Sequence, residues 1–116
     1  MSYRGPVYEV GAFFAGEPAI SDLLLKVVVA RNVDFPDDFA GSVGQAESAP
    51  DASTAFDIKV NAVSVGTITF ASGVTTATFV TAAAGLSLVV GDRLEIHSPA
   101  DINVIADVSI MLSGTR

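Results

Sequence analysis

Residues 56–70 read FDIKVNAVSVGTITF and carry the strongest structural signal in the chain. Apolar and polar residues alternate on either side of Asn61 and Ala62, which is the period of a β-strand buried on one face. Asparagine tolerates the left-handed conformation that tight hairpin turns require. The stretch therefore predicts a β-hairpin in which Phe56, Ile58 and Val60 face a core.

Short strands separated by turns are expected in the rest of the chain. The most apolar stretch, residues 22–31 (DLLLKVVVAR), is rich in β-branched valine, so we expect a central strand buried on much of both faces. Pro36 is expected to end a strand in residues 32–39 or to confine it to an edge. The remaining expected strands are residues 6–14, 75–81, 93–98 and 103–112, with an apolar connection at 85–90 and a polar tail at 113–116.

These patterns predict an all-β fold with about eight short strands. A helix over residues 19–30 is the main competing interpretation, but the three consecutive valines at 27–29 disfavour it. A chain of 116 residues has room for one domain of ordinary size. We therefore expect residues 1–116 to form a single antiparallel β-sandwich, with a jelly roll as one possible topology.

Residues 41–54 (GSVGQAESAPDAST) are small and polar and have no hydrophobic period. They are expected to form a long surface loop. Such a loop is unusual inside a compact domain and is often functional. We therefore treat it as a candidate contact element.

Composition excludes several classes of function. Six Lys and Arg against 13 Asp and Glu give a net charge of −7, which argues against binding to nucleic acid. No apolar run approaches the roughly 20 residues needed to cross a bilayer, so no membrane partner is expected. The chain has no cysteine, and no signal peptide is visible near its start. We expect a protein made in the cytoplasm and retained there or carried out within a larger particle.

No catalytic constellation can be assembled from the sequence. The only imidazole is His97, and its neighbour Ser98 should point to the opposite face of the strand. A nucleophile elbow, a phosphate-binding loop and a dinucleotide fingerprint are all missing from the sequence. We therefore expect a protein that is not an enzyme and has no cofactor.

An acidic cluster around Pro36 is the one candidate for a metal site. Asp34, Asp37 and Asp38 could offer oxygen ligands to calcium if the chain folded back on itself. Their spacing differs from that of an EF-hand loop, so a solvated turn is the favoured interpretation.

Half of the residues are hydrophobic, which is high for an acidic protein of this size. Phe13, Phe14, Phe35 and Phe39 are less securely internal than the other phenylalanines, and some of this apolar surface is expected to form an interface. The candidate interface residues are Tyr3, Tyr8, Phe35, Phe39, Val43, Glu47, Asp51 and Arg116.

Four short patterns carry a resemblance to a known class of proteins. They are F-x-I-x-x-N-x-x-x-V-G-T-I-x-F from Phe56, A-T-F at 77–79, G-D-x-L-x-I-x-x-P from Gly91, and A-D-x-x-I-x-L-x-G-x-R ending at Arg116. With them, the chain resembles small all-β modules encoded among the structural genes of tailed bacteriophages and gene transfer agents. Ala62 departs from the pattern, since glycine is usual after the turn asparagine.

The resemblance implies a structural component of a virion. A capsid decoration, or cement, protein is the first hypothesis: a homotrimer bridging subunits of the major capsid protein. A tail-fibre or tail-tip module that touches the host surface is an alternative, with tail proteins as partners. A second alternative is a carbohydrate-binding or adhesin-like module assisted by calcium at the acidic cluster.

Overall fold

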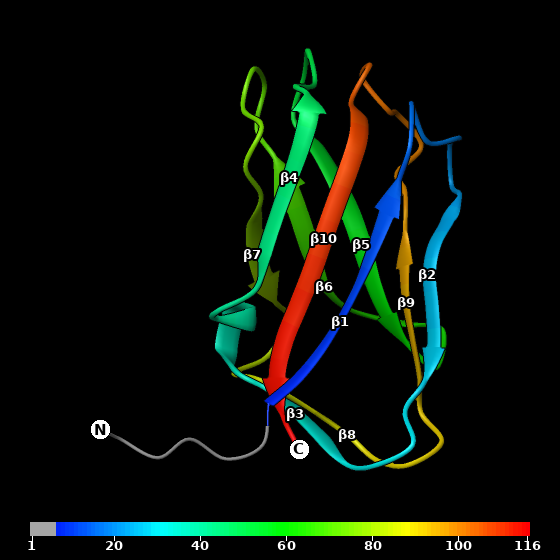
Figure 1. Ribbon diagram of the computed structural model, residues 1–116, viewed down its shortest axis with the longest axis vertical. Coiled ribbons are helices and arrows are strands. Elements are labelled where there is room, and N and C mark those ends of the chain that lie inside the picture. Colours follow the sequence, from blue (N-terminus) through cyan, green and yellow to red (C-terminus); the bar gives the residue numbers. More distant parts are fainter. Residues whose placement is uncertain (1–6) are drawn as a thin grey trace.

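The computed structural model describes residues 7–116, which form ten β-strands and one short 3-10 helix, η1 (Figure 1). Two strands more than expected are therefore present. The elements are β1 (Val7–Phe14), β2 (Leu23–Val28), β3 (Val33–Phe35), η1 (Asp37–Phe39), β4 (Val43–Ser48), β5 (Thr54–Val60), β6 (Val63–Phe70), β7 (Thr78–Thr81), β8 (Leu86–Leu88), β9 (Arg93–His97) and β10 (Ala106–Thr115).

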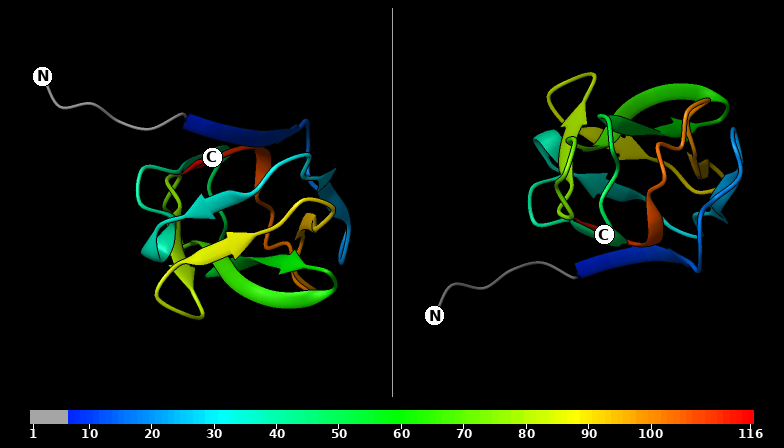
Figure 2. Two further views of the ribbon diagram at one scale, coloured as in Figure 1. Left: turned by 90° about the horizontal axis from the view of Figure 1, so that it is seen from below. Right: turned by 90° about the horizontal axis from the view of Figure 1, so that it is seen from above.

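The strands form two antiparallel sheets that pack face to face (Figures 1 and 2). The front sheet has the order β1-β10-β3-β8, with β4 also paired to β10, and the back sheet has the order β2-β9-β5-β6-β7. The pairs are nested: β1 with β10, β2 with β9, and β3 with β8, around the β5–β6 hairpin. This nesting is that of a jelly roll, and it confirms the predicted β-sandwich.

The hairpin at residues 56–70 forms as predicted. Asn61 and Ala62 both have positive φ, 51° and 70°, as a two-residue type I′ turn requires. Phe56 and Ile58 are fully buried, whereas Val60 is half-buried. The pairing of β5 with β6, at the centre of the nested strand pairs, is therefore specified by local sequence: the alternation of apolar and polar residues and the turn.

Residues 43–48 form strand β4, so the prediction of a long loop over 41–54 is wrong. β4 pairs with β10 from Val43, opposite Met111, to Ser48, opposite Ala106, which leaves only residues 49–53 between β4 and β5. The stretch lacks apolar alternation because its inward positions hold the small residues Gly44 and Ala46, which pack closely. A Cβ at Gly44, for example, would lie 2.8 Å from the Cβ of Ala77.

β2 is an edge strand, which corrects the expected central position of residues 22–31. Within residues 7–116 it pairs only with β9, and Leu23 and Val28 are 44% and 61% exposed. The centre of the back sheet is taken by β9 and β5, because these two strands pair across a long separation in sequence. Hydrophobicity reports how well a residue suits a strand, but it does not report the position of that strand in the sheet.

β10 begins and ends about three residues later than expected. Asn103 and Val104 have positive φ, 56° and 59°, and lie in a turn, so the strand starts at Ala106. It continues to Thr115 and therefore includes most of the expected polar tail. β8, the other unexpected strand, lies within the apolar connection at residues 85–90.

Phe35 and Phe39 belong to the core, so their predicted place in an interface is wrong. They are 2% and 1% exposed, and their ring centroids are 5.2 Å apart. Phe79 packs on Phe39, and the half-buried ring of Tyr8 meets the edge of Phe35 at 6.2 Å. The turn of η1 directs Phe39 inward, which sequence alternation could not indicate.

Candidate functional site

The outer faces of the two sheets differ in chemistry. The front sheet exposes Phe13, Met111 and Val43 on the neighbouring strands β1, β10 and β4. The back sheet exposes a ladder of charged side chains on β9 and β5, beside the exposed Leu23 and Val28 of its edge strand β2. Exposed apolar surface that is contiguous is typical of a binding site. The outer surface of the front sheet, here called the front face, is therefore the candidate functional site.

Two neighbouring rows of residues make up the front face. Gly11, Met111 and Val43 lie side by side across three strands, and Met111 and Val43 are 41% and 65% exposed. In the adjacent row Phe13, 65% exposed, lies beside Ser109 and Gln45. The side chain of Met111 reaches toward Gly11: its Sδ lies 3.0 Å from where a Cβ of Gly11 would be. An apolar patch therefore spans the sheet.

A groove of about 420 Å³ runs along one side of this patch. All of its lining residues are uncharged, and they include Val43, Met111, Gln45 and Ala77. The residues before β7 form its wall: the N–H of Ala77 donates to the carbonyl of Gly44 at 3.0 Å, and the N–H of Ala46 donates to the carbonyl of Thr75 at 2.8 Å. These bonds connect β4 to the chain leading into the back sheet. The groove therefore lies on a rigid backbone.

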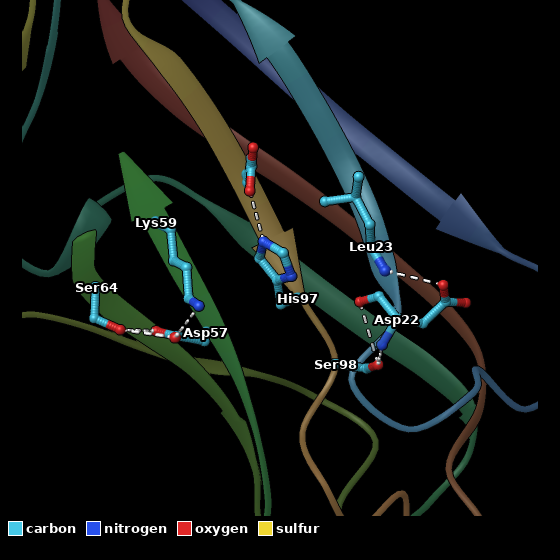
Figure 3. Close-up of polar contacts among 8 residues, drawn as sticks. Asp22, Leu23, Asp57, Lys59, Ser64, His97 and Ser98 are labelled. Atoms are coloured by element: carbon cyan, nitrogen blue, oxygen red, sulfur yellow. Dashed lines mark hydrogen bonds and ion pairs between the residues drawn. The ribbon is translucent and has the colours of Figure 1, made fainter. Parts of the chain in front are cut away.

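The back sheet carries a balanced charge ladder, of which Figure 3 shows His97, Asp57 and Lys59. Glu95 lies between Lys26 and Lys59 in the strand register, and its Oε1 is 2.7 Å from Nε2 of His97. The hydrogen bond with His97 lowers the pKa of the Glu95 carboxyl, and the positive charges of Lys26 and Arg93 act in the same direction. The charges on this face largely compensate one another.

Asp57 forms a second polar group on the same sheet. Its carboxylate accepts hydrogen bonds from the Ser64 hydroxyl at 2.6 and 2.7 Å and lies 3.9 Å from Nζ of Lys59 (Figure 3). Both partners come from the β5–β6 hairpin. The group therefore stabilises the hairpin register across the strands.

His97 and Ser98 have different surroundings. His97 contacts Glu95 on the outer face, whereas the Ser98 hydroxyl accepts from the N–H of Asp22 at 2.6 Å (Figure 3). The same hydroxyl donates to the carbonyl of Ala19 at 2.6 Å. Ser98 is 5% exposed. Its hydroxyl therefore holds the chain before β2 against the end of β9.

The three aspartates of the candidate calcium site are not brought together as a ligand set. Asp34 accepts a hydrogen bond from the Ser87 hydroxyl at 2.7 Å, while Asp37 and Asp38 both contact Thr81. Within residues 7–116 no group of three or more His, Asp or Glu side chains is arranged to hold a metal ion. Asp38 accepts from the N–H of Thr81 at 2.9 Å and thus covers the end of β7.

The other predicted interface residues are scattered. Val43 lies on the front face, and Glu47 lies further along the same side of β4. Asp51 and Arg116 are exposed at other places, and Tyr8 points toward the core. Tyr3 lies outside the described residues. Only Val43 and Glu47 therefore share a surface.

Met111 is missing from the predicted interface residues, and Phe13 is named only among the phenylalanines that are less securely internal, although alternation contained the signal for both. Phe13 lies between two residues on the inner side of β1, and Met111 lies between the buried Ile110 and Leu112 of β10. Residues of opposite parity point to opposite faces of a strand. Apolar residues at the outward-facing positions of each predicted strand therefore indicate both Phe13 and Met111.

Comparisons with protein-family models, with curated proteins and with solved structures found no significant match for this chain. Among residues 7–116 no helix is long and apolar enough to span a membrane.

Proposed function

We propose that this protein is a structural component of a bacteriophage virion, a capsid decoration protein that docks on the major capsid protein through its front face. The observation that carries the proposal is the exposed apolar patch of Phe13, Met111 and Val43 with its adjoining groove, whose lining is uncharged. The resemblance of the sequence patterns to phage structural modules supplies the kind of partner.

The mechanism is mechanical. Docking removes exposed apolar side chains from water, and full burial of one such side chain contributes about 1.5–3 kcal/mol. A protein that binds the assembled shell but not the separate subunits stabilises the shell through mass action. Many copies on one shell would multiply the effect, because each holds its own junction between subunits.

The chemistry of the front face favours a protein partner. It carries none of the stacked aromatic and charged groups that would recognise a phosphate backbone, and the net charge of −7 opposes such a partner. Jelly rolls occur in capsid proteins and in lectins alike, so the fold does not choose between these functions. The front face supports a protein partner, because an apolar groove suits a protein surface better than a glycan.

Incubation of the purified protein with capsids that lack it, followed by sedimentation, tests the proposal. Val43→Glu places a carboxylate in the groove and should weaken binding roughly tenfold to a hundredfold, the equivalent of about 1.5–3 kcal/mol. Val63→Glu is a matched control, since Val63 is 62% exposed, close to the 65% of Val43, but lies at the hairpin tip.

Loss of binding with Val43→Glu and retention with Val63→Glu would support docking through the front face. Equal binding by both variants would remove the front face from the interface. If the wild-type protein did not bind heads but bound isolated tails or host cells, the tail-module alternative would replace decoration.

A further inference from the structure

β1 is a long strand at the margin of the front sheet (Figure 2). It pairs with β10 without interruption from Val7 to Phe14 and has no residue with positive φ. In the part of the chain that the structure describes, no other strand pairs with β1, and no backbone hydrogen bond outside its ladder involves residues 7–14. Its outer edge is therefore open.

The direction of the open backbone groups follows from β10. The N–H of Ser113 donates to the hydroxyl of Ser42 at 2.8 Å, on the side of β10 that faces β4. Glu9 lies opposite Ser113, so this is a non-hydrogen-bonded pair in the β1–β10 ladder, and the N–H and C=O of Glu9 point away from β10. By alternation, the same groups of Val7, Gly11 and Phe13 point to the open edge.

The other sheet margins are protected. The residues before β7 bond to β4, the Asp38 carboxylate accepts from the N–H of Thr81 at the end of β7, and β8 has only three residues. β2 has an irregular register between Leu23 and Leu25 and carries the exposed Lys26. Bulges, lysines, short strands and covering groups are the usual protection against edge pairing. β1 is eight residues long and regular, has no lysine, and carries Glu9 as its one charged side chain.

The sequence of β1 is self-complementary in one antiparallel register. If two copies pair about Val10, Glu9 faces Gly11 of the other copy, and Val7 faces Phe13. No like charges lie directly opposite each other, and the outward backbone groups of four residues in each copy find partners. A register shifted by two residues toward the N-terminus would instead place Glu9 opposite Glu9, which is unfavourable.

We infer that β1 is the contact of a twofold homodimer, in which β1 strands of two copies pair antiparallel and join their front sheets into one continuous sheet. The occupant is a second copy of this chain, because an isologous contact requires a surface complementary to itself, and β1 satisfies that condition about Val10. This inference does not depend on the proposed capsid function. It differs from the homotrimer that the resemblance implies, since a twofold contact produces pairs.

Sedimentation equilibrium over a dilution series tests the inference. The wild-type protein should shift from 11.9 kDa to twice that mass as its concentration rises. A protein that stays monomeric at every concentration would overturn the inference, and so would a stable trimer.

Amide hydrogen exchange gives a residue-level readout of the same contact. In the monomer the amides of Glu9, Gly11 and Phe13 should exchange quickly, while those of Val10 and Ala12, which face β10, should be protected. In the dimer the first group should slow by on the order of tenfold or more. Association without this change at the odd-numbered residues would rule out pairing through β1.

Glu9→Pro tests the role of the backbone directly. Proline removes an N–H that points to the open edge and spares the bonds to β10, so the variant should fold and stay monomeric. If it does not fold, Phe13→Lys serves instead, with Val28→Lys as control because Val28 is 61% exposed on β2. Persistence of the dimer in a folded Glu9→Pro, or in Phe13→Lys, would refute the inference.

Val43→Glu separates this inference from the proposed function. Val43 lies on β4, with β10 between it and β1. The variant should therefore dimerise like the wild type while losing affinity for capsids. Loss of dimerisation in Val43→Glu would contradict pairing through β1 and would point to the front face as the self-contact.

Discussion

Replacing Ala62 by glycine is expected to stabilise the protein, although it removes a side chain. Ala62 has a φ of 70° in the type I′ turn between β5 and β6. A residue with a Cβ in this left-handed region costs about 1–2 kcal/mol. Glycine avoids that cost but gains freedom in the unfolded chain, which offsets about 0.4–1 kcal/mol. The net gain is about 1 kcal/mol.

For a domain of this size such a gain should raise Tm by about 3–5 °C. Thermal unfolding followed by far-UV circular dichroism measures the shift, and urea unfolding gives the free energy of unfolding directly. An unchanged or lower Tm for Ala62→Gly would refute the reasoning, because it would mean that the turn is not strained at this residue.

Asn61→Gly is the matched control in the same turn. Asn61 also has a positive φ, 51°, but its side chain donates to Asp92 Oδ1 at 2.9 Å and accepts from the N–H of Arg93 at 3.0 Å. These bonds connect the hairpin to the start of β9. Glycine loses both of them, so Asn61→Gly should lower Tm where Ala62→Gly raises it.

Two further predictions concern packing and pH. Gly114→Ala should destabilise by about 1–3 kcal/mol in urea unfolding, because its Cβ would lie 2.5 Å from the Asp34 carbonyl oxygen, and an unchanged midpoint would contradict this packing. The lowered pKa of Glu95 contributes stability at neutral pH that is lost as the pH falls below the ordinary value of 4.5 and through the lowered one. His97→Ala should flatten this dependence of Tm on pH and raise the pKa of Glu95 in an NMR titration; an unshifted titration would exclude the His97 contact.

Local patterns were enough to predict the fold class and the hairpin. Alternation in residues 56–70 and the turn chemistry of Asn61 depend on neighbours within a few positions, so they are visible in the chain itself. The same alternation indicated the outward side of Phe13 and Met111. Alternation was therefore enough to predict which residues form the front face. Of the apolar patch on that face, however, the predicted interface residues included only Val43.

The positions of the strands in the sheets came from pairings between distant residues. β4 is a strand because it bonds to β10, which lies about 60 residues later in the chain. β2 is at an edge because β9 pairs with β5. Phe39 is buried because η1 turns it toward Phe35 and Phe79. A short stretch of sequence cannot encode which strand it will pair with, since the nested strand pairing depends on the whole chain. Periodicity therefore determined the faces of each strand, whereas long-range hydrogen bonding determined which edges and faces remained exposed.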